Sequence, residues 1–388
     1  MSSTGPARLG PARDFGCSPV RPRLGVLDFH PIQYHVPLYE HLTVRGRVQL
    51  DVLYLRDHGL APVVDAGFGV PVAWDIDLLS GYRHEFLAGS PLQRASRLTR
   101  WLRDHDAVVI HGHSDPWMLA AVAVCRAAGV RYLLRGDSGP RGQSGGLRGG
   151  IRYGVARAVV GGSAGGLAVG QRNEQFYTAY RAPRTVFAPH SVDNDRFAAT
   201  PPVSRADLLE RWGLDPAQPV VMFCGKLRDA KRPLDLAAAV ARLTEPVSVL
   251  FVGDGPLAGA VRYRLTPGRG AVTGFVNQAE LPAYYHAADI LVLPSQAEPW
   301  GLVVNEAMCA GVLPVVSDRV GCGPDLVAGL GEIYPCGDVA ALATALSRAL
   351  GRYGDPAVGR EMRRRVARYG IGVTAAGFEQ ATLAVTAR

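Results

Sequence analysis

Both lysines of the chain lie in one short segment, residues 225–233, which reads GKLRDAKRP. Lys226 and Lys231 stand alone among 42 Lys and Arg residues, so arginine fills every other basic position. An ammonium group is a compact charge with three rotatable donors, whereas a guanidinium is a planar fork. Two ammonium groups in one loop therefore indicate a site for converging phosphate oxygens. The alternative is a solvated loop that holds both by coincidence.

A second segment, SQAEPWGLVVNEAMCAG at 295–311, carries two carboxylates around a predicted helix start. Glu298 precedes the helix, and Glu306 falls in its second turn. The free amides and the positive dipole end of a helix N-terminus bind anions such as pyrophosphate. Here those amides belong to Gly301, Leu302 and Val303. Two carboxylates beside them can accept hydrogen bonds from hydroxyls on either side of a phosphate. Each glutamate alone could equally complement the helix dipole or lie satisfied at the surface.

The elements that must position these groups are short apolar strands alternating with longer helical stretches, which is typical of βαβ units and parallel sheets. In the first half we predict strands at 23–29, 48–55, 107–113, 130–135 and 166–170, and helices at 35–44, 91–103 and 115–128. In the second half we predict strands at 219–225, 247–253, 271–276, 289–295 and 312–318. The pattern occurs twice, so the sequence predicts an α/β fold of two doubly wound, Rossmann-like domains. Ligands of such sheets bind at the carboxyl ends of the strands, which here would face one central cleft.

The domain boundaries follow from the same pattern. The Pro-, Asn- and Ser-containing segment 188–204 is predicted to link the domains, which we place at 23–200 and 201–374. A last helix at about 375–388 is expected to pack back on the first domain. Residues 1–22 carry Pro, Gly, Ser and Arg without an apolar run, which predicts a disordered tail and no signal peptide.

Composition limits the classes of partner and compartment. A formal net charge of +8 favours an anionic partner. The six cysteines form no CxxC pair, which favours reduced thiols and a cytoplasmic location. The longest apolar run, at 117–125, is too short to span a bilayer, although peripheral membrane contact stays open.

Taken together, these segments resemble the retaining glycosyltransferases of family 4, also called glycosyl transferases group 1, which have the GT-B fold. The resemblance rests on Glu298-x7-Glu306 and on the segments FCGKLRDAKRP, FVGDGPL, VTGFV, LPAYYHAADILVLPS and FAPHSVDNDRF, so it covers most of the chain. It implies a nucleoside diphosphate sugar donor, retention of anomeric configuration and no metal or cofactor. By the resemblance, Glu306 holds the ribose hydroxyls and Glu298 the donor sugar. Lys226 and Lys231 neutralise the departing diphosphate.

The resemblance also assigns residues of the first domain. In VVIHGHSD, His113 matches a histidine that faces the reacting sugar better than His111 does. Where many members have a Gly-Gly loop at the first strand, this chain has HPIQYHVPLY, which puts diphosphate contact from that loop in doubt. We expect its residues to face the acceptor instead, namely Gln33, Tyr34 and His35.

Two Asp-x-Asp triplets, at 75–77 and 193–195, could in principle bind a divalent cation. The second lies in the linker, where Asn and Asp form turns, and the first follows no predicted strand. The lysines and the helix terminus already match a diphosphate. We therefore expect neither a metal nor another cofactor.

Alternative classes of function make different demands. A nucleic-acid- or membrane-binding module would concentrate its basic residues, whereas the arginines here are dispersed. A pyridoxal-phosphate phosphorylase of the same fold needs a Schiff-base lysine, and both lysines belong to a loop already explained. A nucleotide-sugar epimerase of this fold stays a rival. Nucleotide base, sugar and oligomeric state stay open.

The acceptor is expected to bind in the first domain. Trp74, Asp75 and Asp137 lie in loops that should reach the cleft, and carboxylates beside aromatic rings suit a small polar acceptor, including a cationic aminocyclitol. This favours natural-product (antibiotic) biosynthesis, with cell-envelope polysaccharide or glycolipid synthesis as the alternative. The aspartates could equally be turn formers and N-caps, and Arg135 beside Asp137 could recognise an acceptor phosphate.

Overall fold

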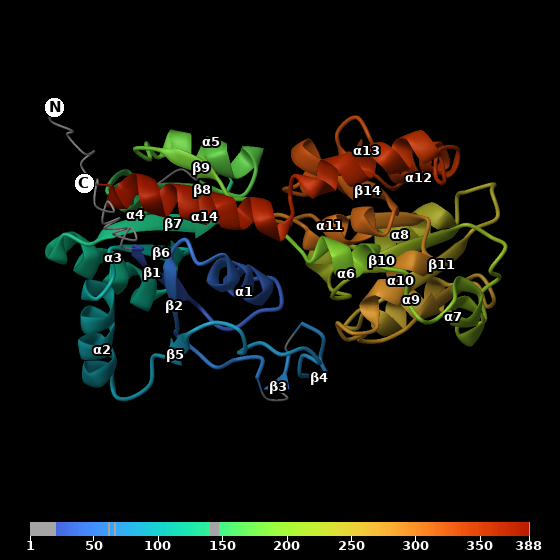
Figure 1. The fold of residues 1–388 in the computed structure, drawn as a ribbon. Coiled ribbons are helices and arrows are strands. Elements are labelled where there is room, and N and C mark those ends of the chain that lie inside the picture. The colour runs from blue at the N-terminus through green and yellow to red at the C-terminus, as the bar shows by residue number, and fades with distance from the viewer. Residues whose placement is uncertain (1–20, 61–62, 66, 140–146, 388) are drawn as a thin grey trace, which may run out of the picture.

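The structure, a computed structural model, describes residues 21–60, 63–65, 67–139 and 147–387 (Figure 1). Two parallel sheets form its centre, one of seven strands in the order β5-β2-β1-β6-β7-β8-β9 and one of six in the order β12-β11-β10-β13-β14-β15. A small hairpin of β3 and β4 stands apart from both. The expected α/β fold of two Rossmann-like sheets is confirmed. Residues 1–20 of the predicted tail lie outside the described residues.

The first sheet and its helices occupy the first half of the chain. Its strands are β1 (Arg23–Asp28), β2 (Gln49–Tyr54), β5 (His84–Phe86), β6 (Ala107–His111), β7 (Arg131–Gly136), β8 (Gly165–Ala168) and β9 (Thr185–Phe187), and the hairpin is β3 (Val63–Val64) with β4 (Pro71–Val72). Its helices are α1 (Val36–Arg45), α2 (Pro91–Arg103), α3 (Pro116–Ala128), α4 (Leu147–Gly161) and α5 (Gln171–Ala179).

The second sheet follows a short crossing segment. Its strands are β10 (Val220–Cys224), β11 (Ser248–Val252), β12 (Gly270–Val272), β13 (Ile290–Leu293), β14 (Leu313–Ser317) and β15 (Glu332–Tyr334). Its helices are α6 (Asn194–Ala198), α7 (Arg205–Arg211), α8 (Pro233–Val240), α9 (Ala258–Arg264), α10 (Leu281–Ala287), α11 (Leu302–Cys309), α12 (Val339–Leu350) and α13 (Pro356–Ala367), with a 3-10 helix η1 (Asp229–Lys231) and a π-helix η2 (Gly323–Val327). The last helix of the chain is α14 (Ile371–Thr386).

Local chemistry explains where the helices begin. Ser90 and Gln93 form a reciprocal capping box at α2, and Asp115 caps α3 ahead of Pro116. Asp193 caps α6 by accepting from the Arg196 amide, so the DND triplet is a helix start. The three predicted helices of the first half are confirmed as α1, α2 and α3, whereas the short edge strands β5, β9 and β15 were not predicted.

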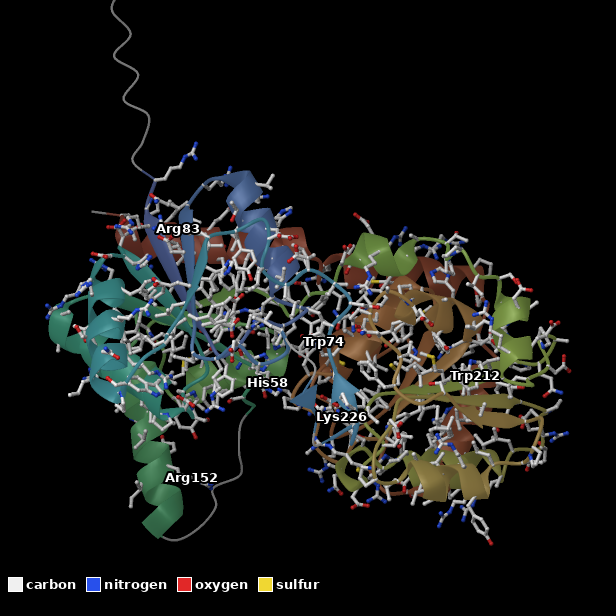
Figure 2. All side chains as sticks on the ribbon, turned by 90° about the horizontal axis from the view of Figure 1, so that it is seen from below. His58, Trp74, Arg83, Arg152, Trp212 and Lys226 are labelled. Carbon is white, nitrogen blue, oxygen red and sulfur yellow. The ribbon has the colours of Figure 1, made fainter. Side chains whose placement is uncertain are left out.

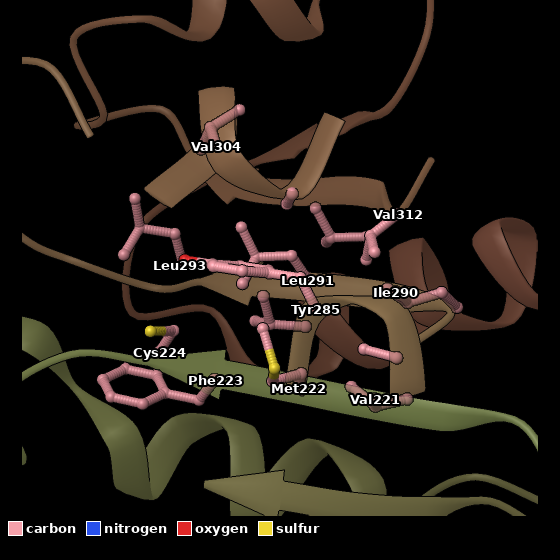
Figure 3. Packing of buried hydrophobic residues seen from close by; sticks show 14 of the residues in the cluster. Val221, Met222, Phe223, Cys224, Tyr285, Ile290, Leu291, Leu293, Val304 and Val312 are labelled. Atoms are coloured by element: carbon pink, nitrogen blue, oxygen red, sulfur yellow. The ribbon is translucent and has the colours of Figure 1, made fainter. Parts of the chain in front are cut away.

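Buried aliphatic side chains of the strands pack each sheet against the helices that cover it. In the second sheet, one buried cluster includes Met222 and Phe223 of β10, Leu291 of β13, Tyr285 of α10 and Val304 of α11 (Figure 3). All of these side chains are removed from water, which is the main favourable term in folding. The carboxyl ends of β10 and β13 are thereby fixed at the edge that faces the first sheet.

The last helix returns to the first half of the chain. Figure 1 shows α14, in red, running beside α1 and the first sheet. Phe378 of α14 is fully buried there, and Arg45 donates two hydrogen bonds of 2.8 Å to Glu379. The crossing therefore ties the two halves together at a second place. Among the described helices, none has the length and apolar character needed to cross a membrane.

Candidate functional site

A cavity of about 670 Å³ lies between the carboxyl ends of the two sheets. Figure 2 shows Trp74 and Lys226 where the two halves of the molecule meet, and both line this cavity. It brings together most of the residues singled out in the sequence, namely Gln33, Tyr34, His35, Trp74, Asp137, Lys226, Lys231, Glu298, Gly301, Leu302, Val303 and Glu306. Segments far apart in the sequence thus meet at one place.

The N-terminus of α11 opens into the cavity. Gly301 is its N-cap with φ of 103°, a left-handed conformation that glycine adopts without strain, and no side chain caps the first turn. Leu302 and Val303 follow along the cavity wall. The first amides of the helix are therefore available to an anion in the cavity, such as the diphosphate expected from the sequence.

Glu306 lies at the inner wall of the cavity and is 0% exposed. Its Oε2 accepts a hydrogen bond of 2.5 Å from Tyr285, and its Oε1 accepts one of 3.1 Å from Tyr34. Burial raises the pKa of Glu306 to about 7, although both hydroxyls act to lower it. A carboxyl group that is half protonated near neutral pH can both accept and donate hydrogen bonds to a ligand hydroxyl.

Each lysine is paired with a carboxylate. The Lys231 ammonium forms an ion pair with Glu298. The Lys226 ammonium donates to both oxygens of Asp65, at 2.7 and 2.8 Å, and lies 4.9 Å from the Phe68 ring centroid. A bound diphosphate would compete with these carboxylates for the same two charges.

Asp65 belongs to an arm, the β3–β4 hairpin and the residues after it as far as Asp75, that reaches from the first half to the second. Phe68 packs against Phe275 with ring centroids 5.0 Å apart. The Asp75 carboxylate accepts from the Ala279 amide at 3.1 Å. Charged, aromatic and backbone contacts therefore hold the arm across the cavity mouth.

Two residues that we predicted to bind the acceptor, Tyr34 and Asp75, have other partners within the protein. Asp75 does not line the cavity, because its carboxylate is engaged by the Ala279 amide between the two halves. Tyr34 lines it but donates to Glu306, on the expected donor side. Asp77, in the first Asp-x-Asp triplet, accepts from the amides of Leu79 and Ser80, which is a turn.

At the end of β1 a buried carboxylate supports a histidine of the cavity wall. Asp28, 3% exposed, accepts from the Nδ1–H of His35 at 2.6 Å and from the Tyr39 hydroxyl at 2.7 Å. Burial acts to raise the pKa of Asp28, but His35, His111 and these hydrogen bonds hold it far below its usual range. The hydrogen bond fixes the orientation of the His35 ring in the cavity wall.

His111, at the end of β6, and His113, just after it, lie differently from our expectation. His111, the last residue of the strand, lines the cavity with its ring centroid 4.5 Å from that of His35. His113 does not line it and stacks on Phe176 instead, with centroids 5.9 Å apart. Gly112, with φ of 82°, separates the two and redirects the chain. The cavity wall therefore holds His111 and not His113, the residue that the resemblance favoured.

Asp28, His35 and His111 also form a group of metal-ligand types, with one ligand atom of each within 4.8 Å of the others. Both Asp28 oxygens already accept hydrogen bonds, Oδ2 from His35 and Tyr39 and Oδ1 from the Phe29 amide. This arrangement fits a hydrogen-bonded carboxylate–imidazole pair better than an ion site. Asp28, Asp65, Phe68 and Tyr285 were missed by the sequence reasoning, because their roles depend on distant partners.

The family described as glycosyl transferases group 1 matches residues 218–352. The 2-deoxystreptamine glucosyltransferase of Streptomyces kanamyceticus is 36% identical over 42% of this chain and 44% of its own length. The D-inositol 3-phosphate glycosyltransferase 2 of Catenulispora acidiphila is 34% identical over 48% and 47%, respectively. The chain thus spans less than half the length of the curated relatives it matches.

The solved structures extend the likeness to nearly the whole chain. HepE of Anabaena, crystallised with UDP, superposes with a TM-score of 0.74 at 16% identity and covers 93% of this chain and 100% of its own. At that identity the likeness concerns the fold. The chain therefore has the fold of GT-B glycosyltransferases, and its second half matches the group 1 family.

Proposed function

We propose that the protein transfers a glycosyl group from a nucleoside diphosphate sugar to a hydroxyl group of a small polar acceptor. The observation that carries this proposal is the cavity in which Lys226, Lys231, Glu306 and the free N-terminus of α11 converge. A diphosphate carries the charge that these groups match. The UDP bound to the similarly folded HepE supports a nucleotide donor.

The roles of the donor-side residues follow from their places. Lys231 and Lys226 exchange their carboxylate partners for the diphosphate oxygens and stabilise the charge that develops as the glycosidic bond breaks. Glu298 is then free to accept hydrogen bonds from the donor sugar. Glu306 binds the ribose hydroxyls, with Tyr34 and Tyr285 fixing its two oxygens.

The transfer proceeds with retention of configuration in this proposal. The departing diphosphate stays on the face from which the acceptor attacks, and it helps to remove the acceptor proton. His35 and His111 lie in the first half of the cavity wall, where the acceptor hydroxyl would be positioned. The cationic groups named above replace the charge that a metal ion would supply.

Similarity to a 2-deoxystreptamine glucosyltransferase supports an aminocyclitol-type acceptor in natural-product biosynthesis. Similarity to D-inositol 3-phosphate glycosyltransferases supports a second candidate, transfer to an anionic or cell-envelope acceptor. The described cysteines are unpaired thiols, which agrees with a cytoplasmic site of action.

A donor screen tests the proposal. Purified protein is incubated with UDP-, GDP- and dTDP-sugars and with 2-deoxystreptamine or other polyols, and released nucleoside diphosphate is measured. We expect release from one donor class and an anomeric proton coupling in the product that matches the donor. Release by no donor would refute glycosyl transfer, and an inverted coupling would refute retention.

Metal independence is tested separately with a chelator. We expect the rate of diphosphate release in excess EDTA to stay within about twofold of the untreated rate, since lysines and helix amides supply the positive charge. A large loss that Mg²⁺ or Mn²⁺ restores would contradict this, and the group formed by Asp28, His35 and His111 would then be the first place to substitute.

A further inference from the structure

Arg135, at the carboxyl end of β7, is a buried cation that lines the cavity with most of its donors unused. The side chain is 2% exposed. Its Nη2 donates to the Pro189 carbonyl at 3.0 Å and, at 3.5 Å, to the Ala188 carbonyl. Its Nε and Nη1 are buried and have no hydrogen-bond partner. Buried donors without acceptors cost free energy, so a ligand that supplies acceptors would gain what the free protein lacks.

The nearest acids leave these donors unsatisfied. The Asp28 oxygens accept from His35, Tyr39 and the Phe29 amide instead. Asp137 lies closer to His190, with its Oδ2 4.0 Å from the ring Nε2. Both carboxylates act on the Arg135 charge from a distance, while burial lowers the pKa of the guanidinium without bringing it near neutral pH.

Two histidines enclose the same corner of the cavity. His111 and His190 both line it, and the Nε2 of His111 is buried with no partner. Burial lowers the pKa of His190, and the Arg135 guanidinium lowers it further. Both rings are therefore neutral near pH 7 and can each donate one hydrogen bond without repelling Arg135.

We propose that Arg135, with His111 and His190, forms an anion subsite at the first-sheet end of the cavity, and that it binds a phosphate group carried by the acceptor. This inference rests on the proposed function, since it assigns chemistry to the acceptor. The diphosphate of the donor has its own cations at the other end, Lys226 and Lys231. The subsite would favour an acceptor phosphate ester over an uncharged or cationic acceptor.

Binding to the nucleotide-loaded protein tests the subsite without knowledge of the acceptor. The one of UDP, GDP and dTDP that binds is added to saturation to fill the donor end, and inorganic phosphate and then glucose 6-phosphate are titrated in by calorimetry. We expect both to bind, and binding to weaken about 10- to 100-fold in Arg135→Gln, as for a charge-assisted hydrogen bond. The exposed Arg83→Gln variant is the matched control and should bind as the wild type does.

The outcomes distinguish free phosphate from the phosphate group of an acceptor, and they distinguish failure of the subsite from failure of the proposed function. No phosphate binding, or equal binding by Arg135→Gln, overturns the subsite. Binding of inorganic phosphate without the ester overturns the assignment to an acceptor. Arg135→Lys, which keeps the charge but loses the fork, should bind with an intermediate affinity and serves if the glutamine variant does not fold. If none of UDP, GDP and dTDP binds, the proposed function fails, whereas phosphate binding that depends on Arg135 would still support the subsite.

Discussion

Two buried carboxylates, one in each half of the molecule, differ in the partners that surround them. Asp28 is 3% exposed and Glu306 is 0% exposed, and each accepts a hydrogen bond from a tyrosine hydroxyl. Asp28 also accepts from His35 and lies near His111, and its pKa is held far below its usual range. Glu306 has only neutral donors, and burial raises its pKa to about 7.

The difference shows how burial alone shifts the pKa of a carboxyl group and how a basic partner changes that shift. Desolvation acts in the same direction on both groups, because it always disfavours the charged form. At Asp28 the imidazoles outweigh it, so the carboxylate stays charged and fixes the ring of His35. At Glu306 nothing outweighs it, so the group can share a proton with a ligand. One carboxylate is suited to support a side chain, and the other is suited to bind.

The largest expected effect comes from removing the two charges in turn. Asp28→Asn should lower the free energy of unfolding at pH 7 by about 3 kcal/mol, since it removes the buried carboxylate charge that accepts from His35 and Tyr39 and puts an amide NH2 group beside it. Glu306→Gln should not lower it at pH 7, because the amide resembles the protonated acid and avoids the cost of a buried charge. Urea unfolding followed by circular dichroism measures both, and equal losses would erase the comparison.

The next effect is the pH dependence of the free energy of unfolding, compared between the wild type and Glu306→Gln. The pKa of Glu306 in the folded protein lies above its ordinary value of 4.5. Its contribution to stability is therefore full below about pH 4.5, falls as pH rises toward about 7 and is constant above. Relative to Glu306→Gln, the wild type should lose on the order of 3 kcal/mol across that window. A difference that stays constant with pH would contradict the raised pKa.

The sequence predicted the second half of the site better than the first, for a physical reason. Lys226, Lys231, Glu298 and Glu306 stand on two short segments, each formed by one strand end and the helix start after it. Local spacing is enough to place such groups. The pair Asp65–Lys226 joins residues 161 positions apart, and no local pattern indicates it.

His111 and His113, at and just after the end of β6, show a second limit of prediction from the sequence. Alternation along a strand places His111 and His113 on the same side, and either could face the cavity. The strand ends at His111, and the positive φ of Gly112 redirects the chain, so alternation no longer applies to His113. The strands themselves were predictable because their buried apolar runs are continuous, as in β10 and β13.

A smaller effect should come from the arm. Asp65 neutralises Lys226 across the cavity mouth, and both side chains are about one third exposed or less. Asp65→Asn should free the ammonium and tighten UDP binding about 2- to 5-fold, the range of a partly exposed ion pair. Asp57→Asn, which changes an exposed acid of the same half, is the control. Unchanged or weaker binding in Asp65→Asn would show that Asp65 does not compete with the donor.

Titration of nucleoside diphosphates into the protein tests the central claim most directly. We expect one of UDP, GDP and dTDP to bind with one site per chain, far more tightly than its nucleoside. Lys231→Ala should weaken it by about 2–5 kcal/mol, whereas the exposed Arg83→Ala should leave it unchanged. Binding no tighter than that of the nucleosides, or full affinity in Lys231→Ala, would contradict a diphosphate site in this cavity.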